Sequence, residues 1–360
     1  MKTRRAYQLL DTFAHADAIG NNVLDIDEIL QRAGWETGIY CVSTAGVKQT
    51  KIALPYSELG KVVDKGPGLL IFHHSTNTEL LGFLEKKEFV GLKKLLVYHN
   101  ITPGEFVRPF DHKQADKWDA ERKRLKKIVK LFDYVIADSE FNLMDLGLKP
   151  GMKATVVPLV ANAVFRGEKT KKTSRKFTRN KNKILYVGRI APNKKIENLI
   201  KTFVVYRDLF NKEAKLEIVG NFAPESRYFC YLCNLIDKVG NDGIRFCGRL
   251  SEDELIQKYM EAGVFLILSE HEGFGVIVLE ACHFGTPVVF LRNTALRETM
   301  GKAGVGASKF NPLFLASILD RLKKDKQWRN CLVKEQKKRL AFFNPKKTER
   351  DFLSVVNKLL

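Results

Sequence analysis

Short apolar runs alternate with helical patterns along the first half of the chain. The β-rich runs are nearly continuous in apolar residues, and segments with a helical repeat separate them. Strands of a parallel sheet have this composition because helices bury both of its faces. The predicted strands lie at 38–43, 69–74, 94–100, 134–139 and 154–159, and the predicted helices at 21–33, 79–85, 116–132 and 140–146.

A second alternation of the same kind begins at residue 183. Before it, 169–183 holds eight basic residues, no acidic residue and one aromatic, which predicts an exposed linker. The second set of strands is predicted at 183–189, 215–220, 244–249, 264–269 and 286–291, with helices near 195–209, 225–239, 252–262 and from about 275.

These patterns predict an α/β protein with two doubly wound, Rossmann-like domains facing a central cleft. The first domain would span 1–165, a basic linker 166–183, and the second domain 184–345. An amphipathic helix at about 346–360 would pack back on the first domain.

The composition, 45% apolar and 28% charged over 360 residues, is that of a globular protein. No run approaches the roughly 18 to 20 apolar residues of a membrane-spanning helix, and the N-terminus lacks the apolar core of a secretory signal. We therefore expect a cytoplasmic protein that could bind peripherally at the inner face of the membrane.

Six cysteines are scattered, and only Cys230 and Cys233 lie close together. Neither a second pair nor neighbouring histidines complete a set of four zinc ligands. The surrounding segment has helical apolar spacing, which predicts buried free thiols. We expect no metal and no cofactor.

The 61 Lys and Arg against 41 Asp and Glu give a formal net charge of +20. Such a field attracts nucleic acid, acidic lipid or phosphorylated small molecules. No helix-turn-helix and no aromatic-studded basic sheet is evident, so nucleic-acid binding is the lesser alternative. For the basic segment 122–130 we hypothesise contact with anionic lipid, solubility being the alternative.

The first candidate site is the loop 187–195, between a strand and a helix. Ligands bind at the carboxyl ends of strands in open α/β sheets. Arg189 and Lys194 are five positions apart there, and two such cations can neutralise a diphosphate from both sides. A solvated basic loop is the alternative reading.

The second candidate site is 270–280, where a loop with two glycines leads into a helix. Glycines let backbone N–H groups approach a ligand, and a helix start favours phosphate. Glu272 and Glu280 could each accept two hydrogen bonds from the vicinal hydroxyls of a sugar. A capping acid plus a solvated acid is the alternative, although Glu280 lies among apolar residues.

The segments VGRIAPNKKIENLI and EHEGFGVIVLEACHFGTPVV, with LEIVG and IRFCGRLSEDEL, make 183–298 similar to family 4 of the retaining glycosyltransferases, the glycosyl transferases group 1 with the GT-B fold. That resemblance implies metal-independent hexosyl transfer with retention. The family usually has glycine after its phosphate-binding lysine. Here Lys195 stands there, so Lys194 and Lys195 could exchange roles.

The resemblance also implies a role for each matching residue. Arg189 and Lys194 would hold the donor diphosphate, Glu272 the sugar and Glu280 the ribose. The first domain would place Gly20 and Asn21, ahead of a helix, beside the phosphates and His99 near the sugar, although an ordinary turn and a structural histidine are the alternatives. The remaining contacts would come from Gly273, Phe274, Gly275, Val276 and Ile277 for sugar and phosphate, and from Gly220, Arg249 and Leu250 for the base.

The function implied is transfer of a hexose from a UDP-, GDP- or other nucleoside-diphosphate sugar to an acceptor hydroxyl. The partners would be that donor and a glycan or lipid-linked acceptor in cell-surface polysaccharide, lipopolysaccharide or glycolipid synthesis. The leaving phosphate would take the acceptor's proton, with Glu272 as a covalent nucleophile the alternative. A GT-B nucleotide-sugar epimerase is the alternative function. The sequence does not identify the sugar, base, acceptor, linkage or oligomeric state.

Overall fold

A computed structural model describes residues 4–14, 17–45, 52–63, 68–76, 78–86, 89–159, 178–240 and 242–360. Its contacts divide the chain into two units. Unit 1 comprises Met1–Gly104, Lys113–Asn162 and Asn344–Leu360, and unit 2 comprises Glu105–His112 and Ala163–Phe343. The predicted linker 166–183 lies mostly outside the described residues.

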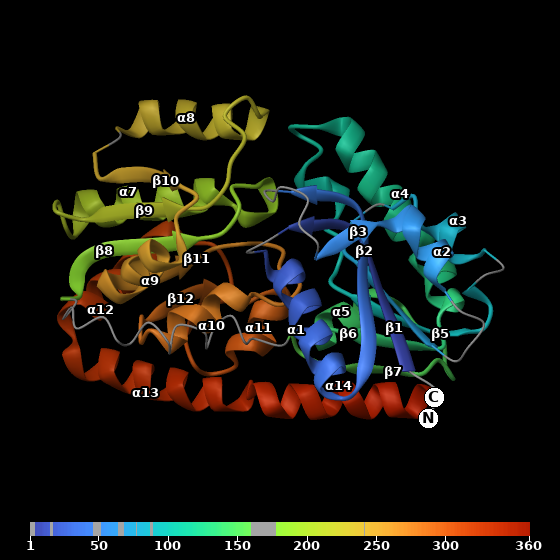
Figure 1. Ribbon diagram of the computed structural model, residues 1–360. Coiled ribbons are helices and arrows are strands. Elements are labelled where there is room, and N and C mark those ends of the chain that lie inside the picture. Colours follow the sequence, from blue (N-terminus) through green and yellow to red (C-terminus); the bar gives the residue numbers. More distant parts are fainter. Residues whose placement is uncertain are drawn as a thin grey trace. The chain divides into compact units, whose positions relative to one another are not determined.

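Unit 1 contains a seven-stranded parallel sheet in the order β3-β2-β1-β4-β5-β6-β7 (Figure 1). β4 is buried at every position, as its apolar run predicted. β1 was not predicted, because charged and polar residues interrupt its apolar pattern. The strands are β1 Arg4–Ala14, β2 Trp35–Ala45, β3 Ala53–Pro55, β4 Gly68–His74, β5 Leu92–Tyr98, β6 Tyr134–Ala137 and β7 Ala154–Val156.

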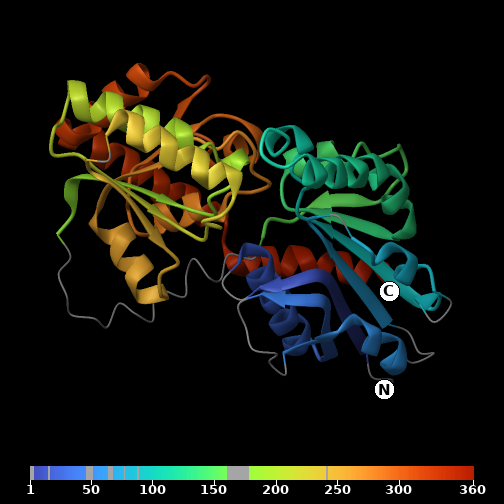
Figure 2. The same cartoon turned by 90° about the horizontal axis from the view of Figure 1, so that it is seen from above.

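Helices cover both faces of this sheet, with a separate apolar core under each (Figures 1 and 2). Leu125 and Ile128 of α4 belong to one core, and Ile29 of α1 and Phe352 of α14 to the other. The C-terminal helix thus packs beside α1. The helices are α1 Ala18–Arg32, α2 Leu59–Val62, α3 Leu81–Leu84, α4 His112–Ile128, α5 Glu140–Asp145 and α14 Pro345–Leu359, with 3-10 turns η1 Tyr56–Glu58 and η4 Val129–Leu131. A further 3-10 turn, η3 Gly104–Phe106, begins at the last residue of the segment Met1–Gly104 of unit 1, and its other two residues belong to unit 2.

Unit 2 contains a six-stranded parallel sheet in the order β10-β9-β8-β11-β12-β13. Its strands are β8 Asn180–Val187, β9 Lys215–Val219, β10 Ile244–Gly248, β11 Ala262–Ile267, β12 Val288–Leu291 and β13 Val305–Ala307. Its helices are α7 Ile196–Leu209, α8 Arg227–Val239, α9 Glu252–Glu261, α10 Val276–His283, α11 Thr294–Met300, α12 Pro312–Lys324 and α13 Lys326–Phe342, with the 3-10 turn η6 Pro192–Lys194.

The strand orders confirm the prediction of two Rossmann-like domains. In each sheet the order reverses once, between β1 and β4 in unit 1 and between β8 and β11 in unit 2. Loops diverge at such a switch point and leave a crevice at the carboxyl ends of the strands, where ligands bind. The loops after β8 and β11 are those that carry Arg189 and Glu272.

Candidate functional site

The two loops at the switch point of unit 2 are hydrogen-bonded to each other through Asn193. Its side-chain amide donates to the carbonyl of His271 over 3.1 Å, and its carbonyl accepts from the Glu270 N–H over 3.0 Å. Asn193 is buried, so these bonds are shielded from water. The loop that carries Lys194 and the loop that carries Glu272 are therefore held together by buried hydrogen bonds.

Lys194 and Glu272 lie on these two loops and contact each other. Lys194 Nζ lies 2.6 Å from Glu272 Oε2, and their side chains are 14% and 7% exposed. Glu272 Oε1 is buried and has no hydrogen-bond partner among the described residues. A buried acceptor left without a partner costs about 1–3 kcal/mol. Glu272 is thus prepared for a ligand that brings hydrogen-bond donors, such as sugar hydroxyls.

Lys195 takes a different direction from Lys194. Its φ is 51°, in the left-handed region that glycine favours. Its ammonium lies 3.4 Å from Glu270 and 3.8 Å from Glu197. Of the two lysines, Lys194 is therefore the one beside Glu272.

Arg189 is exposed, and no ion pair joins it to another described residue. Its guanidinium is thus accessible to an anion. Nearby, Gly220 accounts for the close approach of β8 and β9, since a Cβ there would lie 2.0 Å from the Gly188 carbonyl oxygen. Arg249 is exposed and Leu250 half-buried after β10. All four residues lie at the carboxyl edge of the sheet.

Glu280 lies on α10, and its Oε2 accepts a hydrogen bond from the Tyr259 hydroxyl over 2.7 Å. Burial raises the pKa of the Glu280 carboxyl, while the bond from Tyr259 acts in the opposite direction. A solvated acid, the alternative reading, does not fit this environment. The carboxyl is held on a rigid helix by one hydroxyl, and it can accept further bonds.

The segment Gly273–Ile277 is fixed by the chain that follows β12. Thr294 Oγ1 accepts from the Glu272 N–H over 3.2 Å, and Thr299 Oγ1 donates to the Phe274 carbonyl over 2.6 Å. Gly275 has φ 86° and caps α10, so Val276 and Ile277 form the first turn of that helix. The Phe274 ring is buried against Phe343, so its backbone rather than its ring is placed for a ligand.

Gly20 and Asn21 lie within α1, so the prediction that they precede the helix is wrong. The helix begins at Ala18, and Asp17 is its N-cap, with Oδ1 accepting from the Ala18 N–H over 2.9 Å. A Cβ on Gly20 would lie 2.0 Å from the Ala14 carbonyl oxygen, so glycine lets α1 approach the end of β1. Both residues still lie at the switch point of unit 1.

His99 belongs to a buried hydrogen-bonded tetrad, Gln8–His73–His99–Asp138. The Gln8 amide N–H donates to the Val23 carbonyl over 3.0 Å, so its Oε1 accepts from His73 Nε2, 3.0 Å away. His73 Nδ1 and His99 Nε2 are 3.0 Å apart, and His99 Nδ1 and Asp138 Oδ2 are 2.8 Å apart.

The tetrad has a defined pattern of protons. Burial holds the pKa of His73 well below its usual range, so His73 is neutral. Since its Nε2 donates to Gln8, its Nδ1 must accept from His99 Nε2–H. The remaining proton lies between His99 Nδ1 and Asp138 Oδ2. Burial raises the pKa of the Asp138 carboxyl. Both ring nitrogens of His99 are therefore engaged, and a sugar contact through the ring would require one of these bonds to open.

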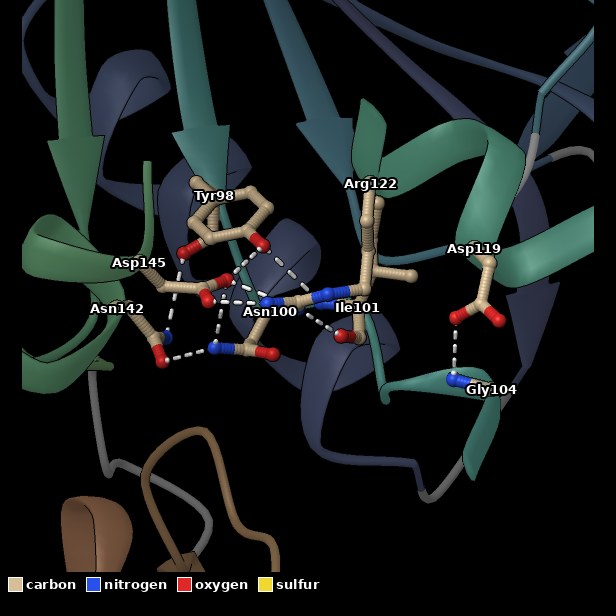
Figure 3. Close-up of polar contacts among 8 residues, drawn as sticks. All are labelled: Tyr98, Asn100, Ile101, Gly104, Asp119, Arg122, Asn142 and Asp145. Carbon is tan, nitrogen blue, oxygen red and sulfur yellow. Dashed lines mark hydrogen bonds and ion pairs between the residues drawn. The ribbon is translucent and has the colours of Figure 1, made fainter. Parts of the chain in front are cut away.

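The loop after β5 is fixed by a second polar network (Figure 3). Arg122 donates to the Ile101 carbonyl over 2.6 Å and to Asp145 over 3.0 Å. The Tyr98 hydroxyl donates to Asp145 over 2.7 Å. Asn100 has φ 74°, a strained conformation for a residue with a side chain. The network thus holds a strained turn directly after His99.

Two sequence-based predictions need correction. Arg122 was assigned to a lipid-facing surface, but its guanidinium turns toward the protein and its side chain is only 25% exposed. Cys230 and Cys233 were predicted to be buried thiols, but Cys230 is exposed and Cys233 half-buried. The buried face of α8 instead consists of Tyr228, Leu232 and Ile236.

The sequence placed His73 and His74 at a strand end without deciding which one faces the cleft, and His73 is the one that contacts His99. Sequence reasoning missed Asn193, Thr294, Gln8 and Asp138. Asn193, Thr294 and Asp138 lie near the end of a predicted strand or at the start of a helix, which was the available signal. Gln8 lies inside β1, which was not predicted. None of the described helices combines the length and apolar composition that crossing a bilayer requires. Within the described ranges, no three or more His, Cys, Asp or Glu side chains group as metal ligands would.

The second half of the chain resembles a known family. Residues 168–339 match the model of the glycosyl transferases group 1 family. An uncharacterized glycosyltransferase of Methanocaldococcus jannaschii is 31% identical over 157 residues, covering 43% of this chain and 39% of its own. The O-antigen chain mannosyltransferase B of Escherichia coli is 29% identical over 146 residues, 40% of this chain and 38% of its own.

A D-inositol 3-phosphate glycosyltransferase of Frankia alni is 29% identical over 228 residues, 60% of this chain and 56% of its own. The chain therefore matches between 38% and 56% of the length of these three relatives.

Solved structures show the same fold over the whole chain. Sucrose-phosphate synthase from Thermosynechococcus elongatus superposes with a TM-score of 0.73 at 18% identity, covering 99% of both chains. HepE of Anabaena, solved in complex with UDP, gives 0.74 at 15% identity, covering 98% of this chain and 100% of its own. At such identities the likeness extends to the GT-B fold and no further.

Proposed function

Residues 168–339 belong to the glycosyl transferases group 1 family, and from this premise we propose that the protein transfers a hexose from a nucleoside-diphosphate sugar to an acceptor hydroxyl. The observation that carries the proposal is the buried Glu272 Oε1, which lacks a partner and adjoins the Lys194 ammonium. On this proposal a site for an anion and a site for a hydroxyl lie side by side at the switch point of unit 2.

In the proposed reaction the cations stabilise the leaving diphosphate. Lys194 has three N–H donors, so it can contact a phosphate while it keeps its bond to Glu272. Arg189 supplies a planar fork for a second phosphate contact. Charge developing on the diphosphate is then met by groups already in place, which lowers the barrier to its departure. On this proposal the two cations do the work of a metal ion.

The carboxylates would bind the two sugars. Glu272 would accept hydrogen bonds from the transferred hexose, and Glu280, fixed by Tyr259, from the ribose. Transfer with retention would follow if the leaving phosphate takes the proton of the acceptor on the same face. The acceptor would be a glycan or a lipid-linked glycan; the name of the E. coli relative, O-antigen chain mannosyltransferase B, supports a glycan.

A nucleotide panel tests this proposal. Thermal unfolding is followed with UDP, GDP, ADP and dTDP, and one of them is expected to raise Tm by about 5 °C or more at saturation. Glu280→Ala should abolish the shift. Tyr259→Phe, which removes the bond to Glu280 but keeps the carboxylate, is the control and should retain most of it. An unchanged shift in Glu280→Ala would show that the ribose lies elsewhere.

A pair of lysine variants tests which lysine holds the diphosphate. Lys194→Met is expected to weaken binding of the selected nucleotide about 10- to 100-fold, the cost of a charge-assisted hydrogen bond. Lys195→Gly should change it by less than about threefold, because glycine adopts the left-handed conformation without strain. Titration calorimetry measures both constants. The reverse ranking would assign the diphosphate to Lys195.

Once a nucleotide is identified, donor turnover separates transfer from epimerisation. A transferase consumes its nucleotide sugar rapidly only when an acceptor is present, and it releases the nucleoside diphosphate. An epimerase converts the sugar without acceptor and keeps the nucleotide attached. Comparing nucleotide release with and without acceptor glycan or lipid therefore decides between the two.

A further inference from the structure

Two polar side chains lie on the face of the unit 1 sheet that α4 covers. Asp11 of β1 and His74 of β4 directly follow the last register pair of the two strands that flank the switch point. Because side chains alternate between the faces of a sheet, both point to the same face as Leu9 and Phe72, two positions earlier. Leu9 and Phe72 belong to the core under α4, and the His74 ring stacks on Phe72 with centroids 5.3 Å apart.

Glu121 of α4 approaches the same position from the opposite side. It lies four residues before Leu125, a core residue, so it is on the inward face of the helix and only 2% exposed. Its Oε1 lies 3.4 Å from His74 Nε2. Thr78, buried after β4, joins the two acids, since its hydroxyl hydrogen-bonds to the Asp11 carboxyl and its N–H to that of Glu121. Asp11, His74 and Glu121 thus form one cluster held by β1, β4 and α4.

The cluster has hydrogen-bonding capacity that unit 1 leaves unused. Asp11 Oδ2 and Glu121 Oε1 are buried and have no hydrogen-bond partner among the described residues. His74 is fully buried, and in the same part of the chain neither of its ring nitrogens has a hydrogen-bond partner. Glu121 Oε2 accepts from Arg124 over 3.1 Å, and the Arg124 side chain is 48% exposed. Buried polar groups of this kind are satisfied when a ligand supplies the missing partners.

The cluster offers acceptors rather than positive charge. Burial raises the pKa of the Asp11 carboxyl to about 7, the bond from Thr78 opposes this, and the charges of Glu121 and Glu79 add to it. Burial lowers the pKa of His74 to about 3, so its ring is neutral at physiological pH. A ligand with hydroxyl groups would satisfy the unused oxygens, whereas a phosphate would meet carboxylates at short range and be repelled.

We infer that this cluster binds the acceptor, and that it accepts hydrogen bonds from the hydroxyls of a sugar unit that carries no phosphate or carboxylate. The inference rests on the proposed transfer reaction, which requires an acceptor and assigns the donor to unit 2. In unit 1 the switch point lies between β1 and β4, and ligands bind at the carboxyl ends of strands at such a point. Asp11 is half-buried and Glu79 exposed, so the cluster reaches the surface of unit 1. A phosphorylated sugar is excluded by repulsion.

Binding of hexoses and of their 6-phosphates tests the inference. The probes are glucose, galactose and mannose, each paired with its 6-phosphate, and saturation-transfer NMR measures their dissociation constants for the full chain saturated with its nucleotide. At least one hexose is expected to bind, and its 6-phosphate to bind at least about tenfold more weakly. Equal or tighter binding of the 6-phosphate would overturn the inference, as would a lack of binding by all three hexoses.

Asp11→Asn tests the assignment to the cluster. It should weaken binding of the hexose about tenfold, the loss of a charged hydrogen-bond acceptor, and it should narrow the gap to the 6-phosphate. Its Tm should equal or exceed that of wild type, because a buried carboxyl with a raised pKa destabilises the fold when it ionises. A purely structural role would lower Tm instead.

Asp133→Asn is the matched control, the same change just before β6 at the amino-terminal edge of the same sheet. It should leave both dissociation constants within about threefold of wild type. If Asp11→Asn binds the probes as Asp133→Asn does, the cluster does not bind the acceptor.

The acceptor assignment and the proposed function fail in different ways. The nucleotide-induced rise in Tm depends on unit 2, so it should be the same in wild type and in Asp11→Asn. If no nucleotide raises Tm, the proposed function fails. If a nucleotide binds and a 6-phosphate binds as tightly as its hexose, only the acceptor assignment fails.

Discussion

Replacing Glu272 with glutamine is expected to lower kcat for hexose transfer about 100- to 1,000-fold, the cost of removing one preorganised charged group from a buried position. Glutamine keeps the shape and one acceptor oxygen, so the loop should stay folded. The lost charge matters because Glu272 pairs with Lys194 at 2.6 Å and offers a second, unpartnered oxygen to the ligand. Initial rates at saturating donor and acceptor measure the effect.

Binding of the nucleoside diphosphate should respond differently to the same change. Without its carboxylate partner the Lys194 ammonium is free for phosphate, so the dissociation constant should stay within about threefold of wild type or fall. Glu270→Gln is the control, since Glu270 lies two residues away and contacts Lys195 instead. Equal losses of kcat in both variants would mean that the loop as a whole, and not Glu272, carries the effect.

The candidate residues at the carboxyl edge of the unit 2 sheet could be predicted because each of them lies close in the sequence to the end of a predicted strand. Arg189 and Glu272 each lie in the loop that follows an apolar strand, and parallel strands bring their carboxyl ends to one edge. The glycine that the family usually has after its lysine carried information as well. In this chain Lys195 stands at that position, and its backbone is in the left-handed conformation. The sequence could indicate this conformation only because a lysine stands where a glycine was expected.

The parts that could not be predicted depend on contacts between distant segments. Gln8, His73, His99 and Asp138 form one chain of hydrogen bonds only because the sheet places β1, β4, β5 and β6 next to one another. The sequence lists their strands in that order but also contains β2 and β3 between β1 and β4. Strand order therefore had to be known before these residues could be paired.

The direction of Arg122 was unpredictable for a related reason. α4 carries seven Lys and Arg residues spread around its faces, so periodicity does not say which one turns inward. Asp145, 23 positions later on α5, makes that choice. Its carboxylate accepts from Arg122 and from the Tyr98 hydroxyl, and the two donors in turn hold Ile101 through its carbonyl and its N–H. One carboxylate thus fixes the turn that follows His99.

Asp145→Ala should therefore destabilise unit 1 by about 2–4 kcal/mol, since it leaves a partly buried guanidinium and a hydroxyl without their acceptor. Asp145→Asn should cost roughly half as much, because the amide oxygen still accepts from Tyr98. Asp351→Ala in the same unit, which removes an exposed pair with Lys347, should cost less than about 1 kcal/mol. Denaturant unfolding measures the free energies, and hydrogen exchange at Ile101 reports whether the turn opens first. If Asp145→Ala costs no more than Asp351→Ala, the network does not hold the turn, and the strained φ of Asn100 must be maintained by the backbone around it.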